Sequence, residues 1–267
     1  MTLDHSPGWP LTDADERLLA AADVLASTIE SQVAAAARPA EENDSDAALI
    51  GAFHVARAAR CLRAVIALCR AGYAVESAAT VRTLLEDATS LRFLSLRPNS
   101  RVRKWLRFDE TRSMEYWRLS EQLGLGLPKS ERIEQLEARG VSGNPVWWSG
   151  KTPSAMAREA RGHDEDLAQT FRALYPWLSD VAHANIKTTV NYYFAASDGT
   201  TMLRVGPSDH LAGLLVRITA DLAVKVCDIA GDVGARTDMS AIRGAKAVVV
   251  AGDEAETEPG HTSPADD

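Results

Sequence analysis

Residues 72–96 read GYAVESAATVRTLLEDATSLRFLSL, and this stretch decides the fold class. From Ala74 to Leu96 it contains no Gly or Pro and is rich in Ala and Leu, which have high helix propensity. Pro98 follows, and a proline ends a helix because it lacks the backbone N–H and crowds the preceding turn. The sequence therefore predicts a long helix from about Ala74 to Leu96.

The preceding segment, Ala47–Ala71, predicts a second helix. Apolar side chains recur along it at helical spacing, and Gly72 follows its last turn, where a left-handed C-terminal cap is common. Only two or three residues separate this helix from the one at Ala74. So short a connection makes the two helices antiparallel neighbours.

Capping residues and helix breakers predict six further helices. They run from Thr12 or Asp13 to Arg38-Pro39, from Asn99 or Ser100 to about Gln122, from Pro128 to near Gly140, from Thr152-Pro153 onward, from near Asp164 past a disturbance at Pro176 to about Asn191, and from Ser208 or Asp209 onward.

One short segment breaks the helical pattern. Two β-prone runs, 192–194 and 202–205, flank Asp198-Gly199, a hairpin-turn dipeptide. The predicted fold is therefore all-α: a bundle of about seven to eight helices with one small β-hairpin near 192–205. Residues 12–236 are predicted to form a single domain after a flexible N-terminus at 1–11.

The acidity of the chain is concentrated at its C-terminal end. The formal net charge is −8, and residues 252–267 hold six Asp or Glu with no Lys, Arg or aromatic residue. Such a segment buries too little apolar surface to offset its conformational entropy. We expect a disordered acidic tail over residues 237–267.

Cysteine usage and apolar run lengths bear on the compartment. Cys61, Cys69 and Cys227 are too few for a disulfide framework and form no C-x-x-C pair, which fits a reducing cytoplasm. No basic start followed by an apolar run suggests a signal peptide, and no apolar run approaches the roughly 18 residues of a membrane span. The sequence predicts a cytoplasmic protein without membrane association.

The first candidate site is Arg82-Thr-Leu-Leu-Glu86 on the predicted 74–96 helix. Residues four apart lie on one helix face, so the two charged side chains share a stripe that is otherwise largely apolar. Burying charge is costly unless it is paired, so this pair is either a functional site or a structural ion pair between helices.

The second candidate lies in Tyr175-Pro-Trp-Leu-Ser179-Asp180-Val-Ala-His183. Ser179 and Asp180 precede His183 by four and three residues, so both reach its helix face. A carboxylate beside an imidazole raises its pKa and fixes its tautomer, which suits a general base or a phosphate contact. A helix-packing histidine satisfied by its carboxylate explains the same residues. No G-x-S-x-G elbow supports a serine hydrolase.

His54 lies beside the apolar stripe of the second helix, where a histidine is either a satisfied core residue or part of a polar cluster with Arg82, Glu86 and His183. The histidines lack metal-ligand spacing and the thiols are scattered, so we predict no metal site and no cofactor.

Two further patterns concern anions. Trp148-Ser-Gly-Lys151-Thr is not a P-loop, because Pro145 stands where the first glycine belongs, but Lys151 at a helix start could still hold an anion. The tryptophan either covers a core edge or stacks on a ligand.

Between residues 92 and 118, eight Lys or Arg with interleaved aromatics make either a solvated helix face or a nucleic-acid surface. The candidate contacts there are Arg101, Arg103, Lys104 and Arg107.

The sequence resembles a large bacterial family of uncharacterised all-helical proteins known as a domain of unknown function. The matching residues are Gly72 to Glu86, Trp148 to Lys151 and Tyr175 to His183, within about Phe53 to Tyr193. The resemblance implies that Arg82, Glu86, Ser179 and His183 belong together, and it brings no established activity.

The helical layout is also loosely similar to the HEPN domains, many of which are metal-independent ribonucleases of toxin and phage-defence systems. That resemblance implies a homodimer and an Arg, four to six residues, then His motif, which Arg158 to His163 fits by spacing.

These observations favour a binding or interaction module with an inter-helix polar site formed by Arg82, Glu86 and His183, with RNA and protein both open as partners. The alternative is a metal-independent ribonuclease in which His183 is the general base and Arg82 stabilises the phosphate.

Overall fold

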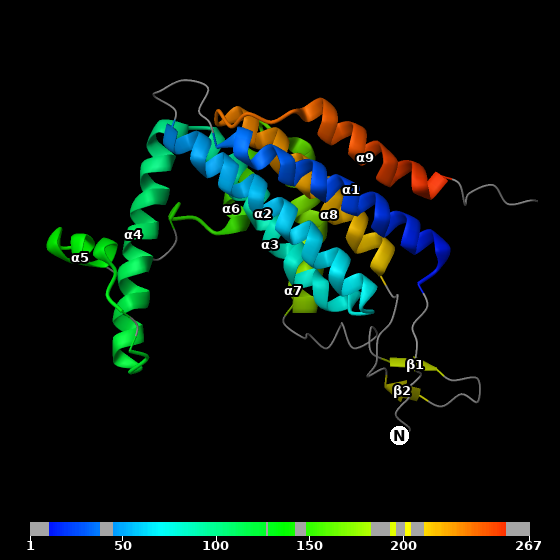
Figure 1. Cartoon of the computed structure of the whole chain (residues 1–267), viewed down its shortest axis with the longest axis horizontal. Helices are drawn as coiled ribbons and strands as arrows, with labels where there is room; N and C mark the ends of the chain where they lie inside the picture. Colours follow the sequence, from blue (N-terminus) through cyan, green and yellow to red (C-terminus); the bar gives the residue numbers. More distant parts are fainter. Residues whose placement is uncertain are drawn as a thin grey trace, which may run out of the picture.

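The computed structural model describes residues 11–37, 45–126, 128–141, 148–182, 193–195, 201–203 and 211–254. Within these ranges the chain forms nine helices and two short strands (Figure 1), and the predicted all-helical class is confirmed. The bounds are α1 Asp13–Ala36, α2 Ser45–Arg70, α3 Ala74–Ser95, α4 Pro98–Gln122, α5 Glu131–Ala138, α6 Pro153–Ala160, α7 Glu165–Ala182, β1 Tyr193–Ala195, β2 Thr201–Leu203, α8 Ala212–Asp232 and α9 Met239–Glu254.

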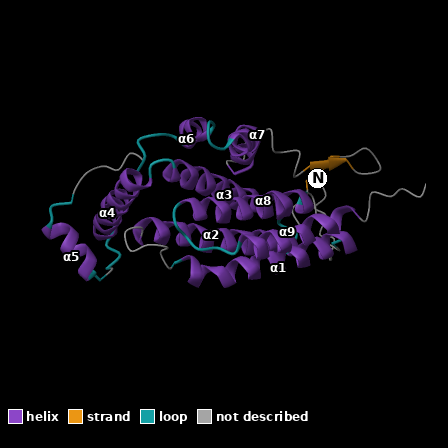
Figure 2. Cartoon of the chain, turned by 90° about the horizontal axis from the view of Figure 1, so that it is seen from above, coloured by secondary structure: helices purple, strands orange, loops and turns teal. Residues whose placement is uncertain are grey.

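The body of the molecule consists of α1, α2, α3, α8 and α9, which lie side by side with roughly aligned axes (Figure 1). Seen from above, α6 and α7 cover α3 on one side, and α1 and α9 lie on the other side (Figure 2). The core between these layers is aliphatic; Leu25, Leu62 and Leu84 are fully buried in it. Burial of these faces stabilises the bundle, and it fixes α7 as the outer neighbour of α3.

The turn between α2 and α3 forms as the sequence predicts. Gly72 adopts φ 79°, a left-handed conformation that suits glycine. The Gly72 N–H donates to the Cys69 carbonyl at 2.9 Å, and the Tyr73 N–H donates to the Leu68 carbonyl at 2.8 Å. This pair of bonds satisfies the last carbonyls of α2 and turns the chain directly into α3.

A close approach between α2 and α8 fixes how deeply these two helices pack. A Cβ atom on Gly51 would lie 2.9 Å from Val233 Cγ2, 2.9 Å from Ala235 Cβ and 3.3 Å from the Ala230 carbonyl oxygen. The residue at position 51 therefore has no room for a side chain. Glycine lowers the helix propensity of α2 at this position, but it allows the two helices to pack more closely.

The helix α9 corrects the predicted domain boundary. The sequence places residues 237–267 in a disordered tail, yet 239–254 form a helix packed on α1 and α8. The described residues therefore contain nine helices, where the sequence predicts seven to eight. Ile242 is fully buried and Val249 is 2% exposed. These apolar residues, seven apart, face the bundle, and the acidic composition that suggested disorder begins after them. Residues 255–267 lie outside the described residues.

The segment 192–205, where the sequence predicts a small hairpin, contains β1 and β2. They pair antiparallel, with Tyr193 opposite Leu203 and Ala195 opposite Thr201. The predicted turn at Asp198-Gly199 lies outside the described residues.

Pro176 lies inside α7 without ending it, because α7 continues to Ala182. The predicted continuation to Asn191 lies outside the described residues, as does the predicted flexible segment up to residue 10.

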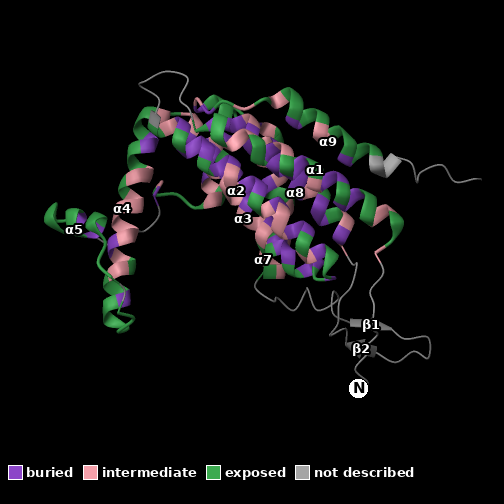
Figure 3. Ribbon diagram, viewed as in Figure 1, coloured by how far each residue is buried: buried purple, intermediate pink, exposed green. Residues whose placement is uncertain are grey.

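The helices α4 and α5 project from the body as an arm (Figure 1). Their small cluster, formed by Met114, Ile133 and Leu136, is separate from the main core. Most of the arm surface is exposed or half-buried (Figure 3). We call α4 and α5 together the arm.

Among the described helices, α1 has the length and apolar composition that a membrane span requires, with a mean hydropathy of 1.2 over its most apolar window. Its buried side chains pack against α2, α8 and α9, which is also how the core helix of a bundle is placed.

Candidate functional site

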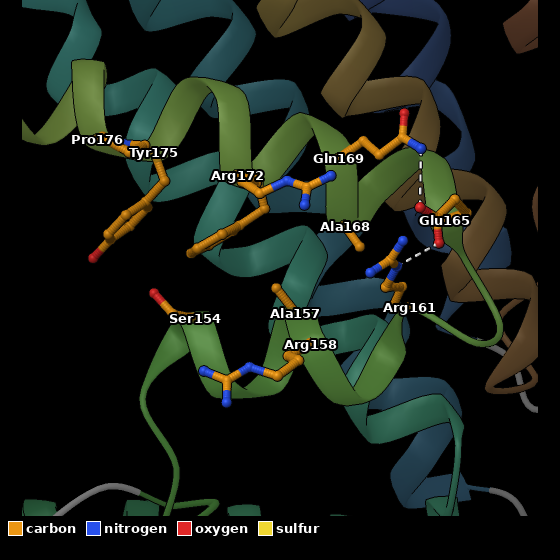
Figure 4. A pocket seen from close by; sticks show the side chains of 11 residues that line it. Ser154, Ala157, Arg158, Arg161, Glu165, Ala168, Gln169, Arg172, Tyr175 and Pro176 are labelled. Carbon is orange, nitrogen blue, oxygen red and sulfur yellow. Dashed lines mark hydrogen bonds and ion pairs between the residues drawn. The ribbon is translucent and has the colours of Figure 1, made fainter.

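A groove of about 420 Å³ separates α6 from α7 (Figure 4). Its floor is apolar and includes Ala157, Ala168 and Phe171, and its rim carries arginines from both helices. Each helix contributes residues that lie on one helical face. They are Ser154, Ala157 and Arg158 from α6, with its C-cap residue Arg161, and Glu165, Ala168, Arg172 and Tyr175 from α7 among others.

Local capping sets where α6 and α7 begin. Thr152 Oγ1 accepts a hydrogen bond from the Ala155 N–H at 3.3 Å, and Pro153 occupies the first turn of α6. Asp164 Oδ1 accepts from the Leu167 N–H at 3.1 Å at the start of α7. The turn at 161–163 between them brings the two helices side by side and leaves the groove in between.

Asp164 also ties α7 to the body of the bundle. Its Oδ2 accepts from Arg92 Nε at 3.1 Å, and its Oδ1 lies 2.8 Å from Lys225 Nζ. Burial would raise the pKa of Asp164, but the hydrogen bonds from Lys225 and Leu167 and the charge of Arg92 hold it below its usual range. Because α3, α7 and α8 meet at this one carboxylate, the α7 wall of the groove is held firmly.

Two arginines on opposite walls give the groove its positive charge. Arg158 on α6 and Arg172 on α7 are exposed, and neither side chain forms an ion pair or hydrogen bond within the residues that the structure describes. Figure 4 draws both beside the apolar floor. Guanidinium groups without an ion pair among the described residues, beside an apolar surface, suit a ligand that has both an apolar body and an acidic group.

One end of the groove is closed by a polar chain. Arg161 Nε donates to Glu165 Oε2 at 2.8 Å, and Gln169 Nε2 donates to Glu165 Oε1 at 2.9 Å. The hydrogen bonds from Arg161 and Gln169 lower the pKa of Glu165. This end is therefore neutralised by its own residues, in contrast to the Arg158 and Arg172 region.

The other end holds Tyr175, which contacts the Arg82–Glu86 pair on α3. Arg82 Nε donates to Glu86 Oε1 at 3.1 Å, as the four-residue spacing predicts, and Arg82 Nη2 donates to the Tyr175 hydroxyl at 3.1 Å. The Tyr175 ring stacks on Phe171 with centroids 4.4 Å apart. Arg82 thus orients a hydroxyl at the mouth of the groove, and that hydroxyl keeps its own proton to donate.

The remaining residues of the second sequence candidate are only partly described. Ser179 and Asp180 lie half-buried on the last turns of α7. His183, the predicted general base, lies outside the described residues. The structure therefore brings Arg82 and Glu86 together with Tyr175, which the sequence analysis had not singled out as their partner.

His54 is buried on α2 beside Asp87 rather than beside Arg82 and Glu86. Its Nδ1 atom lies 3.9 Å from Asp87 Oδ1 and has no hydrogen-bond partner among the described residues. Asp87 Oδ2 accepts from Arg57 Nε at 2.7 Å. Glu86 and Asp87 are neighbours on α3, but Glu86 pairs with Arg82 on α3 itself, whereas Asp87 pairs with Arg57 on α2.

Burial controls the titration of this pair. Burial, followed by the charge of Arg57, lowers the pKa of His54 to about 4, so the imidazole is neutral near pH 7. Burial also raises the pKa of Asp87, although the hydrogen bond and charge of Arg57 act in the opposite direction. A neutral histidine packed edge-on against Phe53, with centroids 5.3 Å apart, fits the structural alternative for His54.

The basic candidates on α4 do not share one exposed face. Arg103, Lys104 and Arg107 are exposed, but Arg101 is 7% exposed and pairs with Glu159. The neighbouring aromatics are partly buried, Trp105 and Phe108 against the main core and Trp117 against the α4–α5 cluster. The face of α4 that carries Arg101 is directed toward α6, so Arg101 is not available on the exposed surface of α4.

Trp148 and Lys151 lie with Arg101 and Lys104 at a second, smaller cavity. Trp148 is 8% exposed and contacts the Phe93 ring edge-on, with centroids 5.8 Å apart, which fits its reading as a core cover. The structure thus joins four candidates that lie far apart in sequence, while Arg103 and Arg107 do not line this cavity.

Sequence reasoning missed Arg172 and Asp87, and it considered Arg158 only within an arginine–histidine motif. Arg158 and Arg172 could have been found from the spacing of small and basic residues along 154–161 and 165–176. Asp87 carries no such signal, because its partners come from another helix. Within the described ranges, no three His, Cys, Asp or Glu side chains lie close enough to hold a metal ion.

No curated protein and no solved structure matches the chain. The resemblance drawn from the Gly72–Glu86, Trp148–Lys151 and Tyr175–His183 motifs is confirmed at the level of the family. The model of DUF5677, a family of unknown function, matches residues 47–201, which is more than half of the chain, and the chain therefore belongs to this family.

Proposed function

We propose that this protein is a binding module whose ligand occupies the groove between α6 and α7. The ligand would be a small amphipathic anion, with an apolar body on Ala157, Ala168 and Phe171 and a carboxylate or phosphate between Arg158 and Arg172. The observation that carries the proposal is this arginine pair, exposed on facing helices and with no ion pair or side-chain hydrogen bond among the described residues. Arg172 lies near enough to Glu165 for its charge to help lower the pKa of that carboxyl, although the two side chains form no ion pair in the described part of the chain.

The dimensions of the groove support a ligand of this class. Its volume of about 420 Å³ falls in the range of small-molecule sites, which are mostly apolar with a few polar groups for orientation. Arg82 orients the Tyr175 hydroxyl at one end, and Ser154 presents a second hydroxyl there (Figure 4). These two groups suit a polar substituent at the far end of the ligand.

The proposal incorporates the Arg82–Glu86 pair in a supporting role. Glu86 accepts from Arg82, and the guanidinium lies 5.1 Å from the centroid of the Tyr175 ring. Arg82 is therefore a positioning residue for Tyr175. We also propose a cytoplasmic location, which the three free thiols support.

A fluorescence titration with 1-anilinonaphthalene-8-sulfonate, an aromatic body with one anionic group, tests this function. Arg158→Ala and Arg172→Ala should each weaken binding by about ten-fold, because each removes a hydrogen-bonding charge from the acid. Arg243→Ala is the control: Arg243 is exposed on α9, where it pairs with Asp228 at 2.8 Å.

A second variant distinguishes the contribution of the apolar floor to ligand binding from that of the two arginines. Ala157→Leu fills the groove and should abolish binding while both arginines remain. Binding that survives Ala157→Leu and the Arg158→Ala, Arg172→Ala double variant would overturn the proposal.

The ribonuclease alternative predicts a different result. It requires RNA cleavage that persists in EDTA and disappears in His183→Ala. Turnover of this kind would replace the binding module with an enzyme.

A further inference from the structure

A second cavity, of about 210 Å³, lies on the opposite side of α6, between that helix and the start of α4. Arg97, Ser100, Arg101 and Lys104 line it at spacings of three, four and seven residues, so they occupy one face of the first two turns of α4. Lys151 and Glu159 line the facing wall. Its residues do not overlap with those of the groove between α6 and α7.

The cavity is strongly positive. Four cationic side chains line it against one carboxylate, Glu159. Glu159 already accepts from both Arg101 and Lys151. Arg97 and Lys104 are exposed at the cavity and form no ion pair within the part of the chain that the structure describes. Two cations are thus left to meet a ligand.

One of the cationic groups, Arg101, is held in place before any ligand arrives. The Arg101 guanidinium lies 3.6 Å from the centroid of the Phe93 ring and donates to the Phe93 carbonyl. Trp148 supports the same ring edge-on. Because Arg101 is buried and also paired with Glu159, the cavity wall beside Arg97 and Lys104 loses little entropy when a ligand binds.

The start of α4 adds to this field. Arg97 is the N-cap residue and makes no side-chain hydrogen bond to the first turn, and Pro98 occupies the first position. The positive end of the helix dipole is therefore uncompensated beside Arg97 and Ser100. This contribution supplements the side-chain charges and does not define the site alone.

We propose that this cavity binds a phosphate monoester on a small body, such as a sugar phosphate. A phosphate carries close to two negative charges at neutral pH and accepts several hydrogen bonds, which Arg97 and Lys104 can donate. The volume corresponds to about seven water molecules, enough for a phosphate and a small polar body. Buried Trp148 offers no open ring face for base stacking, which disfavours a nucleic-acid strand.

Isothermal titration calorimetry of the full chain with inorganic phosphate, ribose 5-phosphate and ribose tests the proposal. Ribose 5-phosphate and phosphate should bind and ribose should not. Arg97→Ala and Lys104→Ala should each weaken phosphate binding about ten-fold, because each removes one charged donor. Arg103→Ala is the matched control, since Arg103 is exposed on the same helix and donates to the Asn99 carbonyl at 3.0 Å instead.

Three outcomes overturn the inference. The first is the absence of saturable binding by phosphate and ribose 5-phosphate up to about 10 mM. The second is equal phosphate affinity in Arg97→Ala, Lys104→Ala and the unmodified protein. The third is binding of single-stranded RNA alone, weakened by Arg103→Ala as much as by Lys104→Ala. Arg243→Ala, which lies outside both the groove and this cavity, should leave phosphate affinity unchanged. Because the groove is tested with 1-anilinonaphthalene-8-sulfonate and this cavity with phosphate and ribose 5-phosphate on other variants, failure at this cavity is distinguishable from failure of the groove.

Discussion

Tyr175 takes part in two assemblies at once, because its ring stacks on Phe171 in the groove and its hydroxyl accepts from Arg82. Tyr175→Phe keeps the ring and removes the hydroxyl. We expect the free energy of unfolding to fall by about 1 kcal/mol, since Arg82 retains Glu86 but loses one hydrogen bond. Urea denaturation measures this change.

Tyr116 provides a matched control for that substitution. Its hydroxyl accepts from Arg112 Nη2 at 2.6 Å, but Tyr116 is 57% exposed on the arm. Tyr116→Phe should change stability by less than about 0.5 kcal/mol, because water replaces the lost bond. Equal losses in the two variants would contradict a positioning role for Arg82.

His54 makes stability depend on pH in a defined direction. Its pKa is about 4 in the folded protein against about 6.5 when unfolded, so the unfolded state binds more protons below neutrality. Stability is therefore full above pH 6.5 and is lost as the pH falls toward 4. The expected loss from His54 between pH 7.5 and 5 is about 2 kcal/mol.

Comparison with His54→Leu isolates this effect from that of Asp87. The raised pKa of Asp87 acts in the opposite direction, since its contribution is present at low pH and is lost as pH rises. Urea denaturation at several pH values should give a smaller decline for His54→Leu than for the unmodified protein. Parallel pH profiles for the two proteins would show that His54 does not titrate as a buried group.

At the scale of helices, two glycines predict opposite effects of the same substitution. Gly51→Ala places a Cβ 2.9 Å from Ala235 and Val233, so we expect a loss of about 1–3 kcal/mol from overpacking. Gly244→Ala on α9 meets no atom within 4 Å, so it should gain about 0.5–1 kcal/mol from helix propensity. Thermal unfolding of both variants measures the signs. A gain at Gly51 would mean that α2 and α8 pack less closely than described.

The sequence predicts helices well where the signal is local. Thr12 caps α1, Gly72 ends α2, and Arg82 and Glu86 pair across one turn, because each depends on residues within a few positions. The groove could not be predicted, because its shape depends on Asp164 contacting Arg92 and Lys225 from other helices.

The helix α9 was missed for a different reason. Ile242 and Val249 repeat at a helical interval, but the acidic residues that follow them shifted the predicted boundary toward residue 237. The burial of Arg101 was equally hidden, since it follows from the packing of α4 near α6 rather than from the sequence of α4 itself. The charge composition of a segment can be read from its sequence, whereas the burial of its residues depends on the helices that pack against it.

At the scale of the whole molecule, α5 and the C-terminal half of α4 should unfold separately from the body, because Trp105 and Phe108 tie the first half of α4 to the main core. Leu136 is 2% exposed in the α4–α5 cluster, which the main core does not include. We expect Leu136→Ala to raise amide hydrogen exchange throughout α5 while α3 and α8 remain protected, because the cluster has few other apolar contacts. Exchange mass spectrometry measures this difference.

Leu84→Ala supplies the contrast, because Leu84 is fully buried in the main core. It should reduce protection across α3 and α8 and lower the global free energy of unfolding by about 2–5 kcal/mol. If Leu136→Ala reduced protection in α3 and α8 equally, the arm would be part of one cooperative unit.

The contact between α1 and α9 has a consequence for how the protein is made. The Asp238 N–H donates to Gln32 Oε1 at 3.1 Å, and α9 packs along α1, so the first helix is completed by the last. A ribosome adding about 5–20 residues per second needs roughly 10–45 s to pass from the end of α1 to the end of α9. During that interval the face of α1 that α9 will cover stays open to solvent. The nascent chain therefore keeps this one face of α1 accessible to chaperones until α9 has been made.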